Sequence, residues 1–300
     1  MAEQSKTDSP QEFMEKMAFQ KVKKMLTTSG CVNCNGYRDE YLKRRFEVRL
    51  RATGANTYGR YIIHLKNHPE EFHNLLNDLT INFTSFFRDT DVYTYLEKKL
   101  LPKLLWTTNP LKIWSAGCAS GEEPYSLAIL IHKLLGQTLS SHSITIFASD
   151  IDNDSLIKAA EGKYQLRQIG NISSLLVEKY FTKKDEDYVV KDFVKQIIHF
   201  EHFDLMSPPK HQDLDLVLCR NVMIYFSKEG QQHIHLGFYN ALKEGGYFIT
   251  GKSEILSGEP AQKFAVIDNQ TRIYQKPRQH SNILVDTLGH SIENDLYHLT

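Results

Sequence analysis

The sequence predicts an α/β fold with a Rossmann-like parallel sheet, preceded by a small all-α domain. Three observations lead to this class. Residues 11–79 show only helical periodicity, apolar strand-like runs alternate with helical patterns from residue 111 onward, and a glycine turn joins the first such run to a helix. The predicted boundaries are residues 1–10 for a disordered N-terminus, 11–80 for the helical domain, 81–276 for the α/β domain and 277–300 for a polar C-terminal tail.

The helical domain is expected to contain four helices. Apolar residues recur at helical spacing in residues 11–26, 37–52, 58–66 and 69–79. The second of these helices carries a basic face that includes Arg44, Arg45, Arg49 and Arg51. This face has two interpretations: solvated arginine heads above stems that cover apolar surface, or a docking surface for an acidic partner. We favour docking, and we expect no nucleic-acid partner because no aromatic platform or nucleic-acid module accompanies the arginines.

The turn after the first predicted strand indicates what kind of ligand the α/β domain binds. Residues 111–116 form an apolar run, Gly117 and Gly121 bracket a turn of small residues, and a helical pattern follows. A strand, a glycine turn and a helix open nucleotide-binding folds. Glu122 and Glu123 would repel a phosphate, and no lysine is there to bind one, which excludes a Walker-type loop. S-adenosylmethionine (SAM), with an ammonium and a sulfonium but no phosphate, suits the turn better. Alternatively, the glycines only shape the turn and the glutamates favour the helix N-terminus.

A second predicted strand, residues 143–150, ends on an acidic residue. Asp150 lies 29 residues beyond Gly121. In dinucleotide-binding folds an acid about 20 residues beyond the glycines binds the ribose hydroxyls. A helix and a polar loop account for the longer spacing here. Asp152 is expected to cap the helix of residues 153–161 instead.

The remaining elements complete the α/β pattern. Residues 187–190 and 196–204 look like strands of a small antiparallel extension at about 182–203, and Gly245-Gly246 is expected to stop a long helix. Further helices are predicted at 91–105, 173–180 and 227–243, and further strands at 214–219, 247–251, 264–268 and 272–275.

Composition limits the class of protein. Thirty-six basic and thirty-six acidic residues cancel in a chain of 300, so no overall field attracts nucleic acid or a membrane. No apolar run approaches the roughly 20 residues of a spanning helix, and the start resembles no signal peptide. We therefore expect a cytoplasmic monomer without membrane insertion. Cys31 and Cys34 form a lone C-x-x-C motif, which we interpret as two reduced loop cysteines and not as a metal site.

Four segments together resemble one known family. They are WSAGCASGEEPYSLA from Trp114, FASDID from Phe147, LCRNVMIYF from Leu218 and TINFTSFFRD from Thr80. The chain is similar over about residues 11–276 to the CheR family, the SAM-dependent protein-glutamate O-methyltransferases of bacterial and archaeal chemotaxis. The resemblance implies a SAM-dependent methyltransferase domain with a small antiparallel extension behind an all-α domain.

The resemblance also implies roles for particular residues. Arg88 and Tyr225 correspond to positions that line the methyl-transfer pocket. The chain departs from the family at Asp204, where asparagine is frequent, and at Lys252, where the family has histidine. Residues 191–195 look like a short loop, typical of members that need no receptor tether. The implied cofactor contacts are Asn82, Thr84, Arg88, Glu122, Asp150, Asp204, Leu205, Arg220 and Asn221.

These implications lead to a functional expectation. The chain would methylate glutamate side chains on the cytoplasmic helices of chemoreceptors, docking them on Arg44, Arg45, Arg49 and Arg51 and releasing S-adenosylhomocysteine. A glutamate carboxylate, with a pKa near 4.3, is already ionised at neutral pH, so this chemistry needs no general base. Two alternatives remain open: a SAM-binding signalling module without catalysis, and a methyltransferase of a small carboxylate.

Overall fold

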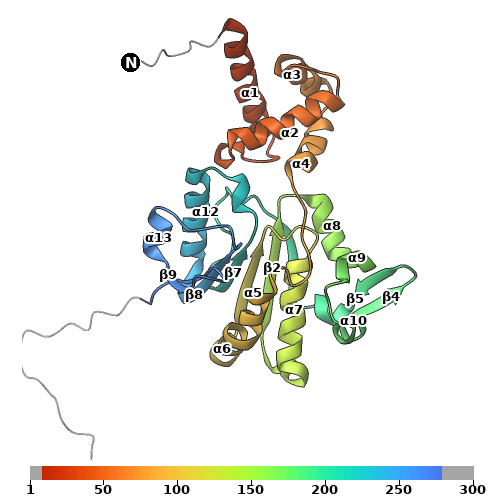
Figure 1. Cartoon of the computed structure of the whole chain (residues 1–300), viewed down its shortest axis with the longest axis vertical. Helices are drawn as coiled ribbons and strands as arrows, with labels where there is room; N and C mark the ends of the chain where they lie inside the picture. Colours follow the sequence, from red (N-terminus) through yellow and green to blue (C-terminus); the bar gives the residue numbers. More distant parts are fainter. Residues whose placement is uncertain (1–8, 279–300) are drawn as a thin grey trace, which may run out of the picture.

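The computed structural model describes residues 9–278, and residues 1–8 and 279–300 of the expected terminal segments lie outside the described residues. A helical domain is joined through a short segment to a larger domain built on a central sheet (Figure 1). Across residues 9–278, no helix combines the length and the apolar character that a membrane span requires.

The four helices predicted for the N-terminal part are all present. Helix α1 begins one residue earlier than expected, because Ser9 caps it in a reciprocal capping box with Glu12. Buried side chains such as Phe19, Phe46 and Tyr61 give these helices a core of their own. The elements are α1 (Pro10–Thr28), the 3₁₀ turn η1 (Cys34–Gly36), α2 (Asp39–Ala52), α3 (Tyr58–Asn67) and α4 (Glu71–Leu79). We call this part the helical domain.

The helix predicted at residues 91–105 is divided into three parts. They are α5 (Thr90–Tyr95), a π-helical turn η2 (Leu96–Leu100) and α6 (Leu101–Thr107). Pro102 lies in the first turn of α6. Proline has no backbone N–H and cannot donate the next hydrogen bond of a regular α-helix. Pro102 therefore explains why the turn just before it is widened into a π-helical turn.

Within the described residues, the larger domain is built on a seven-stranded sheet in the order β6-β2-β1-β7-β8-β10-β9. Strands β6, β2, β1, β7 and β8 are parallel, β10 pairs antiparallel with β8, and β9 pairs antiparallel with β10. The strands are β1 (Leu111–Ala116), β2 (Ile144–Asp150), β6 (Ile198–His202), β7 (Leu214–Cys219), β8 (Leu242–Thr250), β9 (Ala265–Asp268) and β10 (Ile273–Gln275). We call this part the sheet domain.

Helices cover both faces of the sheet. Helices α7 (Glu122–Leu135) and α8 (Asn153–Glu161) lie on one side, and α12 (Lys228–Ala241) and α13 (Glu259–Lys263) lie on the other (Figure 1). A 3₁₀ turn η3 (Gly136–Ser141) follows α7. As predicted, Asp152 caps α8 by accepting hydrogen bonds from the backbone N–H groups of Asp154 and Ser155. This doubly covered parallel sheet confirms the predicted fold class.

The small antiparallel sheet differs from the prediction in its members. It consists of β3 (Lys163–Gln165), β5 (Asp187–Val190) and β4 (Phe181–Lys184), while β6 pairs in parallel with β2 at the edge of the main sheet. The placement of residues 196–204 in the extension was therefore wrong. Short apolar runs do not reveal their strand partners, because periodicity is the same in both sheets. Three short helices alternate along the chain with the strands of the small sheet: α9 (Leu166–Ile169) and α10 (Ser174–Tyr180) lie between β3 and β4, and α11 (Asp192–Lys195) follows β5.

Two local predictions in the sheet domain also fail. Residues 191–195 are not an open loop of the small sheet, because α11 occupies them and packs against α7. Helix α12 ends at Ala241, before the glycine pair that was expected to stop it. Gly245 and Gly246 lie inside β8, next to an irregular register with β7. A Cβ atom on Gly246 would lie 3.0 Å from the carbonyl oxygen of Leu214, so the glycine allows a close backbone approach.

Candidate active site

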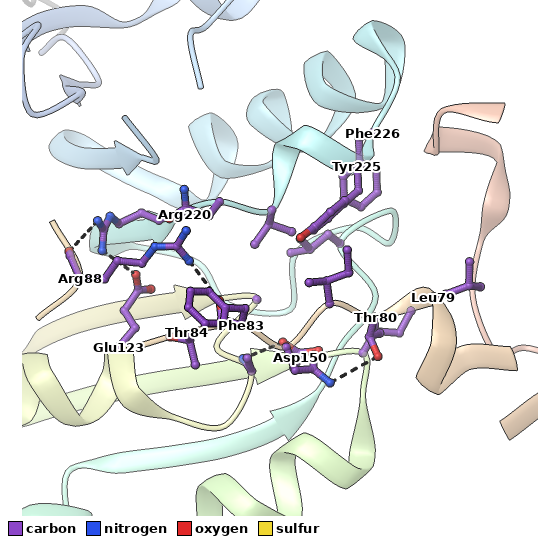
Figure 2. A pocket seen from close by; sticks show the side chains of 18 of the residues that line it. Leu79, Thr80, Phe83, Thr84, Arg88, Glu123, Asp150, Arg220, Tyr225 and Phe226 are labelled. Carbon is purple, nitrogen blue, oxygen red and sulfur yellow. Dashed lines mark hydrogen bonds and ion pairs between the residues drawn. The ribbon is translucent and has the colours of Figure 1, made fainter. Parts of the chain in front are cut away.

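A cavity that is partly open to solvent lies at the carboxyl ends of β1, β2 and β7 beside the helical domain. Ligands of open α/β sheets bind at this edge. All the predicted cofactor and catalytic residues except Glu122 line the cavity, and Figure 2 shows several of them converging on it. These lining residues are Asn82, Thr84, Arg88, Asp150, Asp204, Leu205, Arg220, Asn221 and Tyr225.

Asp150 is fixed at the end of β2 by backbone donors. Its carboxylate accepts hydrogen bonds from the N–H of Ala119 (2.8 Å) and of Asp152 (3.0 Å). Burial raises the pKa of Asp150 above its ordinary value, although these N–H groups act in the opposite direction. Ala119 has a φ of +46°, so the glycine turn presents a strained backbone to this acid. A carboxylate held in this way can accept further hydrogen bonds from hydroxyl groups in the cavity.

The two adjacent glutamates of the glycine turn point to different places. Glu122 is 1% exposed, lies outside the cavity and accepts a hydrogen bond from Ser120 Oγ at 2.7 Å. Glu123 lines the cavity and accepts from Ser115 Oγ at 2.8 Å. Successive residues of a helix point about 100° apart, so neighbouring acids cannot share one target. The cofactor contact of Glu122 stays a prediction, and the adjacent Glu123 is the one of the two glutamates that lines the cavity.

Arg220 forms the centre of an ion-pair network at the base of the cavity. Its guanidinium donates to Asp89 Oδ2 (2.6 Å), to the Arg88 carbonyl oxygen (2.9 Å) and to Glu123 Oε2 (3.4 Å). Burial would lower the pKa of Arg220, but the combined effects of Glu123, Tyr93 and Asp89 outweigh burial and the pKa is raised. Arg220 therefore remains a cation, and its 2% exposed side chain holds the Arg88 carbonyl and the Asp89 carboxylate.

Arg88 and Asn82 belong to the segment that joins the two domains. Arg88 Nη1 donates to the carbonyl oxygen of Phe83 at 3.0 Å, and its guanidinium lies 5.8 Å from the centre of the Phe83 ring. The amide nitrogen of Asn82 donates to Asp152, the cap of α8. Both side chains line the cavity while their contacts fold the segment across it (Figure 2).

Asp204 lines the cavity but uses its carboxylate to join the domains. One oxygen accepts from the N–H of Met206 (2.9 Å), and the other accepts from the N–H of Asn33 (2.8 Å) in the helical domain. The resemblance implied a cofactor contact for this residue. Its side chain instead already serves two backbone groups, one of them from the other domain.

Residues 220–226, which we call the Tyr225 loop, form the remaining wall. They include the 3₁₀ turn η4 (Met223–Tyr225). The Tyr225 ring is half-buried, and burial raises its pKa, against the lowering effect of Arg45 and Arg88. Asn221 has a φ of +61°, and its buried Oδ1 has no hydrogen-bond partner among the described residues. A buried acceptor without a partner is costly, so it fits a ligand that brings an N–H group.

A buried acid that the sequence analysis left without a role holds this loop. Glu254 is 5% exposed and accepts from the N–H groups of Asn221 (2.9 Å), Met223 (2.8 Å) and Gly251 (2.7 Å). Its pKa is raised by burial, which outweighs the opposing effect of these N–H groups. No periodicity or motif spacing distinguishes such an acid from a surface residue in a turn. Two of its three donors come from a segment about thirty positions away.

The predicted docking arginines divide into two groups. Arg49 forms a two-pronged ion pair with Glu71 (2.7 and 2.8 Å) and a further pair with Asp78 (3.0 Å). Since Glu71 is 3% exposed, Arg49 holds α2 against α4 and is not free to dock a partner. The other three arginines line a shallow groove on α2 that we call the basic groove. Its lining residues are Tyr41, Arg44, Arg45, Glu47, Val48, Arg51, Ile81, Ile224 and Tyr225.

The paired cysteines lie apart from the cavity. Cys31 and Cys34 are free, and burial raises the pKa of Cys34 to about 12. A thiol with so high a pKa is almost entirely protonated at neutral pH and is a poor nucleophile. Cys34 is part of the core of the helical domain, and Cys31 packs against that core.

The fold and the cavity together define a class of protein. A doubly covered parallel sheet, a glycine turn after β1 and an acid at the end of β2 are the features of a SAM-dependent methyltransferase domain. The cavity fits SAM for two reasons. Asn221 Oδ1 is a buried acceptor without a partner, which an N–H of the cofactor would satisfy. SAM carries no phosphate, and no lysine that could bind a phosphate is among the described residues that line the cavity. Residues 82–273 match the model of the CheR methyltransferase SAM-binding domain, and residues 17–80 match the CheR all-alpha domain. The chain belongs to the CheR methyltransferase family.

Individual relatives agree with this assignment. A chemotaxis protein methyltransferase of Listeria monocytogenes is 32% identical over 234 residues, which are 78% of this chain and 88% of that protein. An uncharacterized 104.1 kDa protein of Rhodobacter capsulatus is 30% identical over 272 residues, and this chain spans only 28% of its length. A solved SAM-dependent O-methyltransferase of Thermotoga maritima, 14% identical, gives a TM-score of 0.34 over 63% of this chain and 49% of that one, too low to carry an argument.

Proposed function

We propose that this protein transfers the methyl group of SAM to glutamate side chains on the cytoplasmic helices of chemoreceptors. The observation that carries the proposal is a shared wall: Tyr225 and Ile81 line both the cavity and the basic groove. An acidic helix lying on Arg44, Arg45 and Arg51 would therefore place a carboxylate beside the methyl-transfer pocket. Membership of the CheR family and relatives named as chemotaxis methyltransferases support this choice.

Residues of the cavity have distinct tasks in this proposal. SAM, when bound, supplies a methyl group that is activated by a positively charged sulfur. Asp150 accepts hydrogen bonds from ribose hydroxyls, and Asn221 Oδ1 accepts an N–H from the cofactor. Arg220 and Glu123 neutralise each other and keep the base of the cavity rigid.

The reaction needs alignment more than acid–base chemistry. The substrate carboxylate is ionised at neutral pH, so no residue has to remove a proton. Tyr225 stays protonated because burial raises its pKa, and its hydroxyl can donate a hydrogen bond in the pocket. The positive charge of Arg88 attracts the carboxylate of the substrate glutamate. Orientation of this kind contributes about 7–11 kcal/mol in model reactions, and exclusion of water from the pocket favours the union of two opposite charges.

The proposal is tested by incubating the protein with methyl-labelled SAM and receptor cytoplasmic fragments. We expect the receptor fragment to become labelled. Base treatment should then release the label as methanol, because methyl esters hydrolyse readily in base. Label that resists base would indicate another acceptor. SAM binding without transfer would indicate a non-catalytic module, and transfer to small carboxylates but not to the fragments would indicate a small-molecule enzyme.

The basic groove can be tested separately. The double variant Arg44→Glu and Arg51→Glu should raise the receptor KM several-fold and flatten its salt dependence, because screened surface charges steer the acidic helix. SAM affinity, measured by calorimetry, should not change. Arg60→Glu, an exposed charge reversal on α3 outside the groove, is the matched control. If both charge reversals raise KM equally, net charge and not the groove determines docking.

A further inference from the structure

A short stretch of the helical domain, residues 33–41, lies directly against the Tyr225 loop. We propose that this stretch positions Tyr225 for methyl transfer and that Arg38 is the positioning residue. This inference rests on the proposed function, and it extends that function by making the helical domain part of the transfer site as well as a docking surface.

Backbone contacts fix the end of the loop from the other domain. Arg38 donates from its N–H to the carbonyl oxygen of Tyr225 (3.1 Å) and from Nε to that of Phe226 (2.9 Å). The N–H of Ser227 in turn donates to the carbonyl oxygen of Gly36 (2.7 Å). Tyr37 and Phe226 form an isolated antiparallel bridge. Three successive residues that begin with Tyr225 are thus hydrogen-bonded to the helical domain.

Ring contacts fix the orientation of the side chain. The centre of the Tyr225 ring lies 4.9 Å from that of Tyr41, and Tyr37 packs on Phe226 at 4.4 Å. Tyr41 is 5% exposed and belongs to the core of the helical domain, against which Tyr225 also packs. The ring that the proposed reaction uses therefore lies on side chains of the other domain.

The two domains approach more closely here than most side chains would allow. A Cβ atom on Gly230, near the start of α12, would lie 2.9 Å from the carbonyl carbon of Gly36 and would overlap its oxygen. A Cβ on Gly36 would overlap Met206. Real Cβ atoms do not come this close to backbone, so this contact requires glycine at position 230, whereas the overlap at Gly36 is with the end of a flexible methionine side chain.

Arg38 also links this contact to the basic groove. It occupies the cap position of α2, and α2 carries Arg44, Arg45 and Arg51. Helix α2 is tied to α4 through the ion pair of Arg49 with the buried Glu71. A partner that docks on α2 therefore contacts the same helix whose cap residue holds the carbonyl groups of Tyr225 and Phe226.

The test compares Arg38→Ala with Arg38→Lys in single-turnover assays at saturating SAM and receptor fragment. We expect Arg38→Ala to lower the turnover rate about tenfold, which is the loss of one charge-assisted hydrogen bond. SAM affinity and the thermal midpoint should change little. Arg38→Lys should restore most of the rate, because an ammonium can still donate to the Phe226 carbonyl. Unchanged turnover in Arg38→Ala would overturn the proposal, and so would a defect confined to the receptor KM that disappears at high salt.

A matched glycine pair on α12 provides a second test. Gly230→Ala should reproduce the loss of turnover by pushing residues 33–41 away. Gly237→Ala, where the new Cβ meets only the Pro209 ring, at 3.3 Å from Cγ and 3.4 Å from Cδ, should retain the wild-type rate. Both substitutions add the same methyl group to the same helix, so a general effect on α12 would slow both. Equal rates in the two variants would contradict the proposal.

A readout that needs no activity separates this inference from the proposed function. Tyrosines are replaced by 3-fluorotyrosine, and the fluorine resonance of Tyr225 is assigned by its loss in Tyr225→Phe. We expect Arg38→Ala and Gly230→Ala to shift this resonance, and Arg38→Lys and Gly237→Ala to leave it in place. If the wild type methylates no receptor, the proposed function fails but this measurement still decides whether the helical domain positions Tyr225.

Discussion

The glycine turn of residues 117–123 and the Tyr225 loop form opposite walls of one cavity, but they are held in different ways. The turn is fixed by its immediate structural neighbour: the N–H groups of Gly117 and Cys118 both donate to the carbonyl oxygen of Ser149 on the adjacent strand. The Tyr225 loop is fixed by Glu254 from beyond β8 and by the helical domain. One wall is therefore specified by a strand, a turn and a helix, and the other is assembled from distant parts of the chain.

This difference has a consequence for how each wall responds to substitution. A change in the turn acts locally, on the group that it presents to the cofactor. A change at the supports of the Tyr225 loop acts at a distance, because Asn221 and Tyr225 move with the backbone that Glu254 and Arg38 hold. The following predictions test that contrast, beginning with the largest expected effect.

Asp150→Ala should produce the largest loss. It removes an acceptor for the ribose hydroxyls and also releases the N–H of Ala119 in the turn. Since a charge-assisted hydrogen bond contributes about 1.5–3 kcal/mol, we expect SAM affinity to fall about ten- to a hundredfold. Calorimetric titration of the folded variant measures this. Asp154→Ala, two positions into α8 and outside the cavity, is the control, and unchanged affinity in Asp150→Ala would remove this acid from the cofactor site.

The pH dependence of SAM binding sharpens this prediction. Burial raises the pKa of Asp150 above its ordinary value of 3.8, so its carboxylate is protonated at a higher pH than a surface aspartate. Protonation removes an acceptor. Affinity should therefore fall as the pH is lowered, beginning above the range in which ordinary aspartates titrate. Asp150→Asn should show weaker binding without this dependence, and an equal pH profile in both proteins would mean that another group titrates.

The contrast between the walls also explains what could be predicted from the sequence. The glycine turn, β1, β2 and the cap of α8 follow from patterns within a few consecutive residues. The strand β6 was assigned to the wrong sheet because its partner β2 lies about fifty positions earlier, and no periodicity records that pairing. Gly245 and Gly246 were expected to end a helix, but they lie inside β8, where Gly246 allows the strand to pass close to β7.

The site residues divide along the same line. The resemblance to the family named nine residues that line one cavity, and seven of them lie in the four contiguous segments that carry the resemblance. Which of the two adjacent glutamates lines the cavity depends on the directions in which successive residues of a helix point, and composition does not reveal those directions. Arg49 could be distinguished from Arg44 only by knowing that Glu71 lies buried opposite it. Burial and long-range partners are properties of the packed chain, and local sequence does not contain them.

Glu254→Gln should produce the second-largest effect, although Glu254 does not line the cavity. The amide that replaces one carboxylate oxygen turns N–H groups toward the N–H of Met223 or toward those of Asn221 and Gly251, depending on its rotamer. Donor–donor contact displaces the Tyr225 loop, so both SAM affinity and kcat should fall about tenfold. Glu259→Gln, an exposed change on α13, is the matched control. Wild-type kinetics in Glu254→Gln would show that the loop keeps its position without this acid.

Tyr225→Phe separates binding from chemistry within the loop. The substitution removes one hydroxyl and preserves the ring that packs on Tyr41. Loss of one hydrogen bond that acts during transfer should lower kcat about three- to tenfold and leave the SAM Kd unchanged. A single-turnover assay at saturating SAM measures this. If kcat is unchanged, Tyr225 serves only as a packing surface between the two domains.

Lys252→Ala should have the smallest effect, although it lies two positions from Glu254 in the same turn. The family has histidine here, but in this structure Lys252 Nζ donates to Asp91 at 2.6 Å on the surface, and its side chain is 43% exposed. Exposed ion pairs contribute about 0–1 kcal/mol, so the thermal midpoint should change little, and SAM affinity and kcat should stay within about twofold. Such a result, beside a tenfold loss in Glu254→Gln, would show that this turn acts on the Tyr225 loop through its buried acid alone. A kcat loss in Lys252→Ala as large as that of Glu254→Gln would instead mean that the whole turn positions the loop, with the bond to Asp91 at the start of α5 as a further support.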